Sequence, residues 1–130
     1  MKLLLDTHVW LWSLLDPKRV SKSAAKALAS PDNALHLSPI SVWETLVLTR
    51  RGRLALEPDP AEWVRQALRN SPVTMTPITH DVAIRSESLE GFASPDPADR
   101  VLVATAIEHD FVLVTADETM RRSDAVETLW

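Results

Sequence analysis

The sequence predicts an α/β protein in which a mainly parallel sheet of about five strands is covered by helices on both faces. Short apolar runs alternate with longer stretches that carry helix-capping residues, and this alternation is typical of βαβ units joined by right-handed crossovers. Of the 130 residues, 45% are hydrophobic and 25% are charged, as in folded globular proteins. No repeat, linker or low-complexity stretch interrupts the chain, so we expect a single domain over residues 1–130.

Five apolar runs have the length of strands. In the first of them, three leucines follow Lys2 without a polar interruption, which is typical of a strand that is buried on both faces. Turn-forming or helix-capping residues bound the others. The predicted strands span residues 2–5, 34–37, 73–78, 111–115 and 126–129.

The stretches between these strands begin with residues that cap helices. Ser38-Pro39 and Asp59-Pro60 each place a side-chain acceptor at the N-cap and proline at the first helical position. Thr7 is expected to cap the helix that follows the first strand. The predicted helices span residues 7–15, 21–29 or 23–29, 39–50, 60–70, 79–89 and 98–109.

Composition excludes several classes of protein. Without cysteine there is no disulfide, thiolate nucleophile or cysteine-ligated metal. The formal net charge of −4 argues against extended nucleic-acid binding, although an enzyme that holds Mg²⁺ or Mn²⁺ in an acidic pocket is compatible with it. Only Gly52 and Gly91 are present, so a glycine-rich phosphate-binding loop is not possible.

The apolar start of the chain superficially resembles a signal peptide. Asp6 and His8 interrupt it, the run is too short to span a bilayer, and no small-residue cleavage site follows. We therefore expect no targeting segment, no membrane association and a cytoplasmic location.

Acidic residues follow two of the predicted strands. Asp6 comes directly after the first strand and Asp117 lies two residues after the fourth, and ligands of open parallel sheets bind beyond the carboxyl ends of the strands. Asp99 occupies the first turn of a helix whose face continues into apolar residues, where the helix N-terminus favours an anion. These three carboxylates are expected at one edge of the sheet.

Glu44 lies on an apolar helix face between Ile40 and Leu48, so its carboxylate is expected to point into the protein. Burying it without a partner would cost several kcal/mol, so it requires a metal ion, a shared proton or an arginine. The arginines that could form a structural ion pair with it are Arg50, Arg51, Arg53 and Arg100.

Each acid also has a purely structural interpretation. Asp96 is most simply an N-cap, Asp99 could only complement the helix dipole, Asp117 could be an ordinary turn residue and Asp6 could cap the next helix. Taken together the acids favour a metal site, because Mg²⁺ and Mn²⁺ prefer oxygen ligands. His8 is expected to support this site or contact substrate, and the other histidines to be ordinary surface or core residues.

The first predicted helix carries most of the large apolar side chains. Four of them are expected in the core: Trp10, Leu11, Leu14 and Leu15. Trp12 and Trp130 are expected to be exposed and to mark a protein interface.

Several segments resemble one family in their order and spacing: LLLDTHVWLW, LSPISVWE, GRL, PITHDVA, DPADRVLVATA and LVTADE. The chain resembles PIN-domain endoribonucleases, specifically VapC-like toxins of type II toxin–antitoxin modules. The resemblance implies a three-layer α/β/α sandwich and a catalytic, metal-binding quartet of Asp6, Glu44, Asp99 and Asp117. It also implies a further acid at Asp96 and a supporting threonine at Thr115, with Thr7 as a second supporting residue. Met120 departs from the family, because an aromatic residue often follows the last acid.

The resemblance further implies metal-dependent hydrolysis of RNA phosphodiester bonds. One or two Mg²⁺ or Mn²⁺ ions would position a water and lower its pKa, and single-stranded or loop RNA would be cut to 3′-hydroxyl and 5′-phosphate ends. We expect a homodimer controlled by a separate antitoxin protein whose tail covers the acidic pocket. The candidates for contacts with RNA phosphates are Arg50, Arg51, Arg53 and Arg100.

Other functions fit less well. Receiver domains and haloacid-type phosphatases rely on a late lysine, and no lysine follows Lys26. A PIN-like domain that has lost activity and only binds a partner remains an alternative, as does a free-standing RNA-processing nuclease without an antitoxin. A metal-dependent cleavage assay separates the first of these from the enzyme.

Overall fold

The computed structural model describes every residue from Met1 to Trp130 and contains one five-stranded sheet. All four strand pairings are parallel, in the order β3-β2-β1-β4-β5, which confirms the predicted α/β class. The strands are β1 Lys2–Leu5, β2 Ala34–Leu37, β3 Val73–Met75, β4 Val112–Val114 and β5 Thr128–Leu129.

Helices connect the strands, as the capping residues predict. They are α1 Thr7–Leu15, the 3₁₀ turn η1 Pro17–Arg19, α2 Lys22–Ala29, α3 Pro39–Arg50, α4 Pro60–Asn70, α5 His80–Ser86, α6 Pro97–His109 and α7 Glu118–Arg121. None of them combines the length and apolar character needed to cross a lipid bilayer.

Several elements differ from the prediction. Strands β4 and β5 cover only Val112–Val114 and Thr128–Leu129 of the predicted runs 111–115 and 126–129. The run 73–78 pairs as a strand only to Met75, because Thr76 makes one more bond to the carbonyl oxygen of Leu37 and Pro77 has no N–H to continue the ladder. Helix α5 ends at Ser86 instead of Leu89, where i→i+3 bonds tighten the last turn. Helix α7 was not predicted, since four residues are too few to show a periodic pattern.

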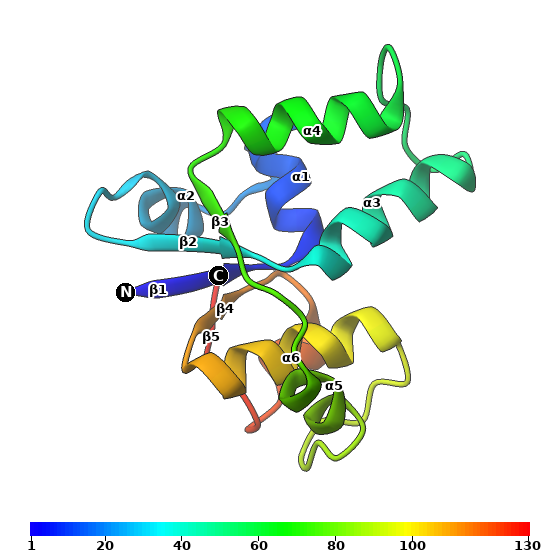
Figure 1. The fold of residues 1–130 in the computed structure, drawn as a ribbon. Helices are drawn as coiled ribbons and strands as arrows, with labels where there is room; N and C mark the ends of the chain where they lie inside the picture. The colour runs from blue at the N-terminus through cyan, green and yellow to red at the C-terminus, as the bar shows by residue number, and fades with distance from the viewer.

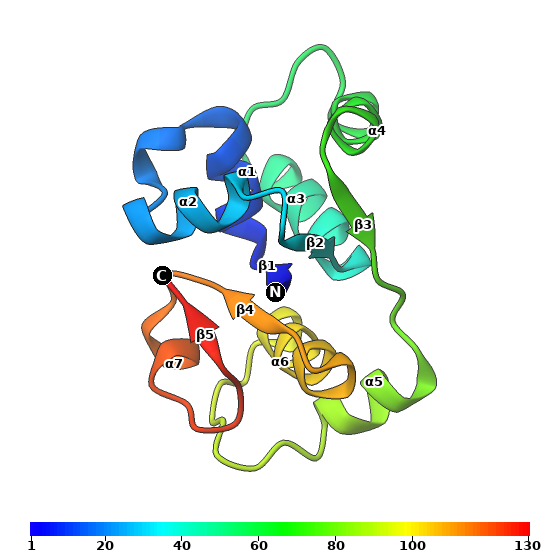
Figure 2. The same ribbon diagram turned by 90° about the vertical axis from the view of Figure 1, so that its left-hand side faces the viewer.

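The sheet separates two layers of helices (Figures 1 and 2). Helices α1 to α4 lie on one side of it, and α5, α6 and α7 lie on the other. Strand β1 supplies both cores, because successive side chains of a strand point to opposite faces: Leu3 and Leu5 belong to one apolar cluster and Leu4 to the other. The α/β/α sandwich follows directly from this buried central strand.

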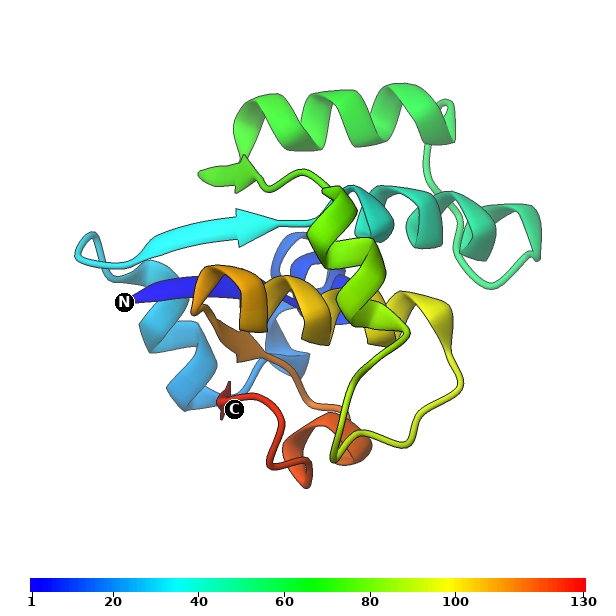
Figure 3. The same cartoon turned by 60° about the horizontal axis from the view of Figure 1, so that its bottom comes forward.

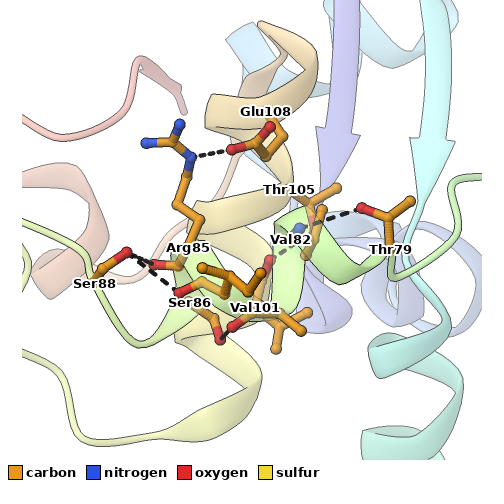
Figure 4. A network of polar contacts seen from close by, with 10 residues as sticks. Thr79, Val82, Arg85, Ser86, Ser88, Val101, Thr105 and Glu108 are labelled. Carbon is orange, nitrogen blue, oxygen red and sulfur yellow. Dashed lines mark hydrogen bonds and ion pairs between the residues drawn. The ribbon is translucent and has the colours of Figure 1, made fainter.

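Helix α5 packs across α6 and holds it in place (Figure 4). Thr79 caps α5 by accepting a hydrogen bond from the Val82 N–H, and Arg85 forms an ion pair with Glu108 of α6. The ion pair is partly exposed and therefore contributes little to stability, and a 2.8 Å hydrogen bond from Arg100 Nε of α6 to the Ser86 carbonyl of α5 also joins the two helices. This matters for function because α6 carries Asp96 and Asp99 at its beginning.

The burial of side chains on the first helix differs from the prediction in both directions. Trp10 and Leu11 are core residues as predicted, but Leu14 and Leu15 are 42% and 46% exposed, because they lie in the last turn of α1, at the rim of surface grooves. The prediction that Trp12 and Trp130 are exposed is wrong: both are half-buried, because their rings pack against each other with centroids 6.0 Å apart.

The carboxyl ends of the strands form one edge of the molecule. Helix α3 continues outward from the end of β2, and the amino-terminal end of α6 lies on the same side (Figure 3). Since α1 also starts at this edge, residues that are far apart in the sequence come together there.

Candidate active site

A pocket of about 380 Å³ lies at the carboxyl edge of the sheet, where ligands of parallel α/β folds bind. All four acids of the predicted quartet line it, together with Asp96. The lining residues are Asp6, His8, Trp12, Arg19, Glu44, Asp96, Asp99, Ala116 and Asp117.

Asp6 is held at the base of this pocket by the neighbouring strand. Its backbone N–H continues the ladder to the Val114 carbonyl, and its Oδ2 accepts a hydrogen bond of 2.7 Å from the Thr115 hydroxyl. The backbone of Asp6 is the N-cap of α1, but its side chain makes no capping bond, so the capping interpretation of this carboxylate is wrong. Burial raises its pKa, although the Thr115 hydrogen bond and the nearby His8 oppose the shift.

Thr115 connects two of the acids. Besides donating to Asp6, its hydroxyl accepts a 3.0 Å hydrogen bond from the Asp117 N–H. Asp117 in turn caps α7, because its Oδ1 accepts from the Met120 N–H at 3.0 Å. Asp117 therefore has the structural role considered from the sequence, through one carboxylate oxygen, and it also lines the pocket.

Glu44 reaches the pocket from α3 without an ion-pair partner. No arginine or lysine pairs with it, so the structural ion pair considered from the sequence does not form. Arg100 instead donates from Nε to the Ser86 carbonyl at 2.8 Å and from Nη1 to the Ser94 carbonyl at 3.0 Å. The Arg100 guanidinium thus supports the loop before α6 and does not line the pocket.

A buried hydrogen bond joins α1 to α3 behind the pocket. The Thr7 hydroxyl donates to the Ser41 hydroxyl at 2.8 Å, and both residues are completely buried. The prediction that Thr7 caps α1 is therefore wrong: Asp6 is the N-cap, and Thr7 is the first helical residue, whose hydroxyl joins α1 to α3. Thr7 directly follows Asp6 and Ser41 lies one turn before Glu44, so this bond joins the two segments that carry these acids.

Asp96 and Asp99 bring two more carboxylates to the start of α6. Asp96 caps the helix by accepting from the Ala98 N–H at 2.9 Å, while Asp99 lies in the first turn and accepts a long 3.4 Å bond from the Ser94 hydroxyl. Burial is the main cause that raises the pKa of Asp99 to about 7, and the negative charges of Asp96, Asp6, Asp117 and Glu44 add to it. The carboxyl group of Asp99 is therefore partly protonated near neutral pH when no cation is present.

His8, which was expected to support the site or contact substrate, lies close to two of the acids. Asp6, His8 and Glu44 each offer an atom within 4.8 Å of the others, a separation that one metal ion could bridge. Asp6 has extended backbone angles of −61° and 149° and is not yet helical, so the divergence of neighbouring side chains on a helix does not apply between Asp6 and His8. Its side chain can therefore approach that of His8 two residues later.

Arg19 and Trp12 also line the pocket, and no sequence signal marked Arg19. It sits in η1 with its guanidinium 4.3 Å from the centre of the Trp12 ring. None of the five carboxylates in the pocket pairs with this or any other arginine or lysine. Five acids without a protein counter-ion, one of them with a pKa near 7, form a site that fits a divalent cation.

The fold and the pocket together define a parallel α/β protein with a carboxylate-rich, cation-compatible site at the carboxyl edge of its sheet. The chain belongs to the PIN domain family, whose model matches residues 3–126. This confirms the resemblance seen in the sequence.

Individual relatives agree with this assignment. Ribonuclease VapC22 of Mycobacterium tuberculosis is 36% identical over 129 residues, which cover 98% of this chain and 97% of that protein. Among solved structures, VapBC2 of Rickettsia felis bound to a DNA fragment from its promoter has a TM-score of 0.74 at 13% identity, with 99% and 98% of the two chains covered. A toxin–antitoxin complex of Klebsiella pneumoniae has a TM-score of 0.61 at 24% identity, with 95% and 94% covered. The similarity to these structures demonstrates the shared fold.

Proposed function

We propose that residues 1–130 form a single PIN domain that hydrolyses RNA phosphodiester bonds as a metal-dependent endoribonuclease, the toxin of a type II toxin–antitoxin module. The observation that carries the proposal is the convergence of Asp6, Glu44, Asp99 and Asp117 on one pocket without a basic partner. The 36% identity to a protein named as a ribonuclease supports it.

The cofactor is Mg²⁺ or Mn²⁺, held by oxygen atoms of the quartet, with Asp96 and His8 at its margin. When bound, such an ion supplies Lewis acidity, which lowers the pKa of a coordinated water and offsets charge on the phosphate. Cations of this class select oxygen ligands, and the pocket offers carboxylates in excess.

The residues around the pocket orient these carboxylates. Thr115 fixes one oxygen of Asp6, and the α7 N-terminus fixes one oxygen of Asp117, so each keeps its second oxygen for a ligand. Asp99 exchanges a proton near neutral pH, and the other four acids line the same pocket. This preorganisation reduces the cost of arranging charge around the reacting phosphate.

Control is assigned to a separate antitoxin in the same cytoplasm. The structural neighbours include toxin–antitoxin complexes, and the acidic pocket complements a basic side chain. An arginine of the antitoxin tail would match paired carboxylates in fork geometry and compete with the cation, while apolar residues of the tail pack against Trp12. Homodimerisation is part of the proposal.

Cleavage of single-stranded RNA by purified protein tests the activity. We expect products with 3′-hydroxyl and 5′-phosphate ends, and loss of cleavage in Asp6→Asn and Glu44→Gln with the fold retained. Wild-type rates in both variants would exclude the site.

Co-expression with the protein encoded by the adjacent open reading frame tests the toxin role: if no complex forms, or if the complex cleaves RNA normally, a free-standing RNA-processing enzyme is the better account.

A further inference from the structure

A second groove adjoins the acidic pocket along α1 and the end of α3. It also has a volume of about 380 Å³ and shares His8, Trp12 and Arg19 with the acidic pocket, so the two form a continuous depression. We call it the α1–α3 groove. Its other walls include Leu48, Arg53 and Leu54.

Arg19 stands where the groove meets the acidic pocket, and Trp12 holds it there. Its guanidinium lies 4.3 Å from the centre of the Trp12 ring, and Trp130 and His8 pack around the same ring at 6.0 and 5.9 Å. Although five carboxylates line the adjacent pocket, Arg19 forms an ion pair with none of them. A stacked arginine keeps its N–H edge free for an anion, so the guanidinium is preoriented and unpaired.

Arg53 supplies a second unpaired cation on the α1–α3 groove. Its backbone N–H donates to the Leu48 carbonyl at 2.9 Å, and Gly52 adopts the positive φ of 72° that this helix ending requires. The backbone at Arg53 is therefore anchored while its exposed side chain forms no ion pair. The single carboxylate on the groove is Asp16, so the two arginines leave it with net positive charge.

We propose that the α1–α3 groove binds the single-stranded RNA segment that flanks the scissile phosphate. Arg19 and Arg53 contact backbone phosphates, and the apolar walls at Leu48 and Leu54 receive a base. This inference rests on the proposed ribonuclease function and adds the path of the RNA strand across the protein surface. It also explains how an acidic protein can bind a polyanion: positive charge is concentrated beside the cation site and not spread over the surface.

RNA matches the chemistry of the groove better than a peptide does. Planar guanidinium groups next to apolar and aromatic side chains are the combination that proteins use for the phosphates and bases of single strands. The size also suits a nucleotide, since small-ligand pockets begin at about 300 Å³.

The test is the affinity of intact protein for a short, fluorescently labelled single-stranded oligoribonucleotide, measured by anisotropy in Ca²⁺, which binds oxygen ligands but supports little turnover. Arg19→Gln and Arg53→Gln should each weaken binding by about tenfold and flatten the dependence of log Kd on log salt by roughly 0.7. Lys22→Gln is the control, because it removes one positive charge from an exposed side chain that forms no ion pair and does not line the groove, and it should bind nearly as wild type.

The outcomes separate the two proposals. Equal weakening by Lys22→Gln would show a general charge effect and overturn the groove assignment. If the wild type cleaves RNA while Arg19→Gln and Arg53→Gln bind it normally, the groove proposal fails and the ribonuclease stands. If the same two variants lose affinity only for the protein encoded by the adjacent open reading frame, the groove binds that protein and not RNA, and the proposal is overturned. If the wild type neither binds nor cleaves RNA, both proposals fail. Circular dichroism confirms that each variant is folded.

Discussion

Replacing Asp99 by asparagine should stabilise the protein in the absence of divalent cations. The pKa of Asp99 rises from 3.8 to about 7, which would correspond to roughly 4 kcal/mol of destabilisation at high pH if the group were isolated from water. Because the carboxyl is only partly buried, solvent screening reduces this to about 1 to 2 kcal/mol. Asparagine also loses an interaction with the α6 dipole of about 0.5 kcal/mol. The net gain is about 1 kcal/mol, or about 3 to 5 °C in Tm for a domain of this size.

The pH dependence of folding stability tests independently whether the charge on Asp99 destabilises the protein. An acid whose pKa is higher in the folded state binds more protons folded than unfolded between pH 4 and 7, so the stability of the wild type should fall as pH rises through that window. Asp99→Asn should remove the part of this fall that comes from Asp99, while the raised pKa of Asp6 contributes to the fall in both proteins. The two proteins should converge below pH 4.

Thermal unfolding in EDTA at pH 5 and pH 8 measures both effects. Asp81→Asn is the matched control, because Asp81 also lies in the first turn of a helix but is exposed, and its replacement should leave Tm unchanged or slightly lower. If Asp99→Asn unfolds at or below the wild-type temperature at pH 8, or if the wild type is more stable at pH 8 than at pH 5, crowding of negative charge at this site is refuted.

Three further predictions concern the residues around the pocket. Thr115→Val removes the donor to Asp6 and leaves the Asp117 N–H without its acceptor, so urea unfolding should show a loss of about 1 to 3 kcal/mol; an unchanged midpoint would contradict this. Glu44→Gln should leave Tm in EDTA unchanged or higher, because no cation pairs with Glu44, while RNA cleavage is lost; a clear drop in Tm would reveal a structural partner. Ser41→Ala should lower the cleavage rate at saturating RNA although Ser41 does not line the pocket, because the tie between α1 and α3 is broken; a wild-type rate would show that this tie is not needed.

The parallel sheet and the meeting of the acids could be predicted because both depend on chain direction. Once β1 and β4 are recognised as parallel strands, Asp6 and Asp117 must emerge at the same edge, and the apolar face of α3 turns Glu44 inward. The position of Asp99 in the first turn of α6 could be predicted from the capping residues that mark the start of this helix. These inferences need no knowledge of side-chain packing.

Features that depend on packing were missed. The position of Arg19 results from a 3₁₀ turn that brings η1 back over Trp12, and no periodic pattern encodes it. His8 approaches Asp6 only because the backbone at Asp6 is extended. Leu14 has an apolar side chain like its buried neighbours, but whether α4 covers it is decided by the angle between two helices.

A single titration tests the central claim, that the acidic pocket is a metal-dependent ribonuclease centre. Mn²⁺ is added to EDTA-treated, dialysed protein while Tm and the rate of RNA cleavage are followed together. Cation binding to the folded state should raise Tm, and cleavage should appear over the same range of Mn²⁺ concentration, whereas Asp6→Asn should show neither change. Full cleavage in the presence of chelator, or a rise in Tm of the same size in Asp6→Asn, would contradict the account.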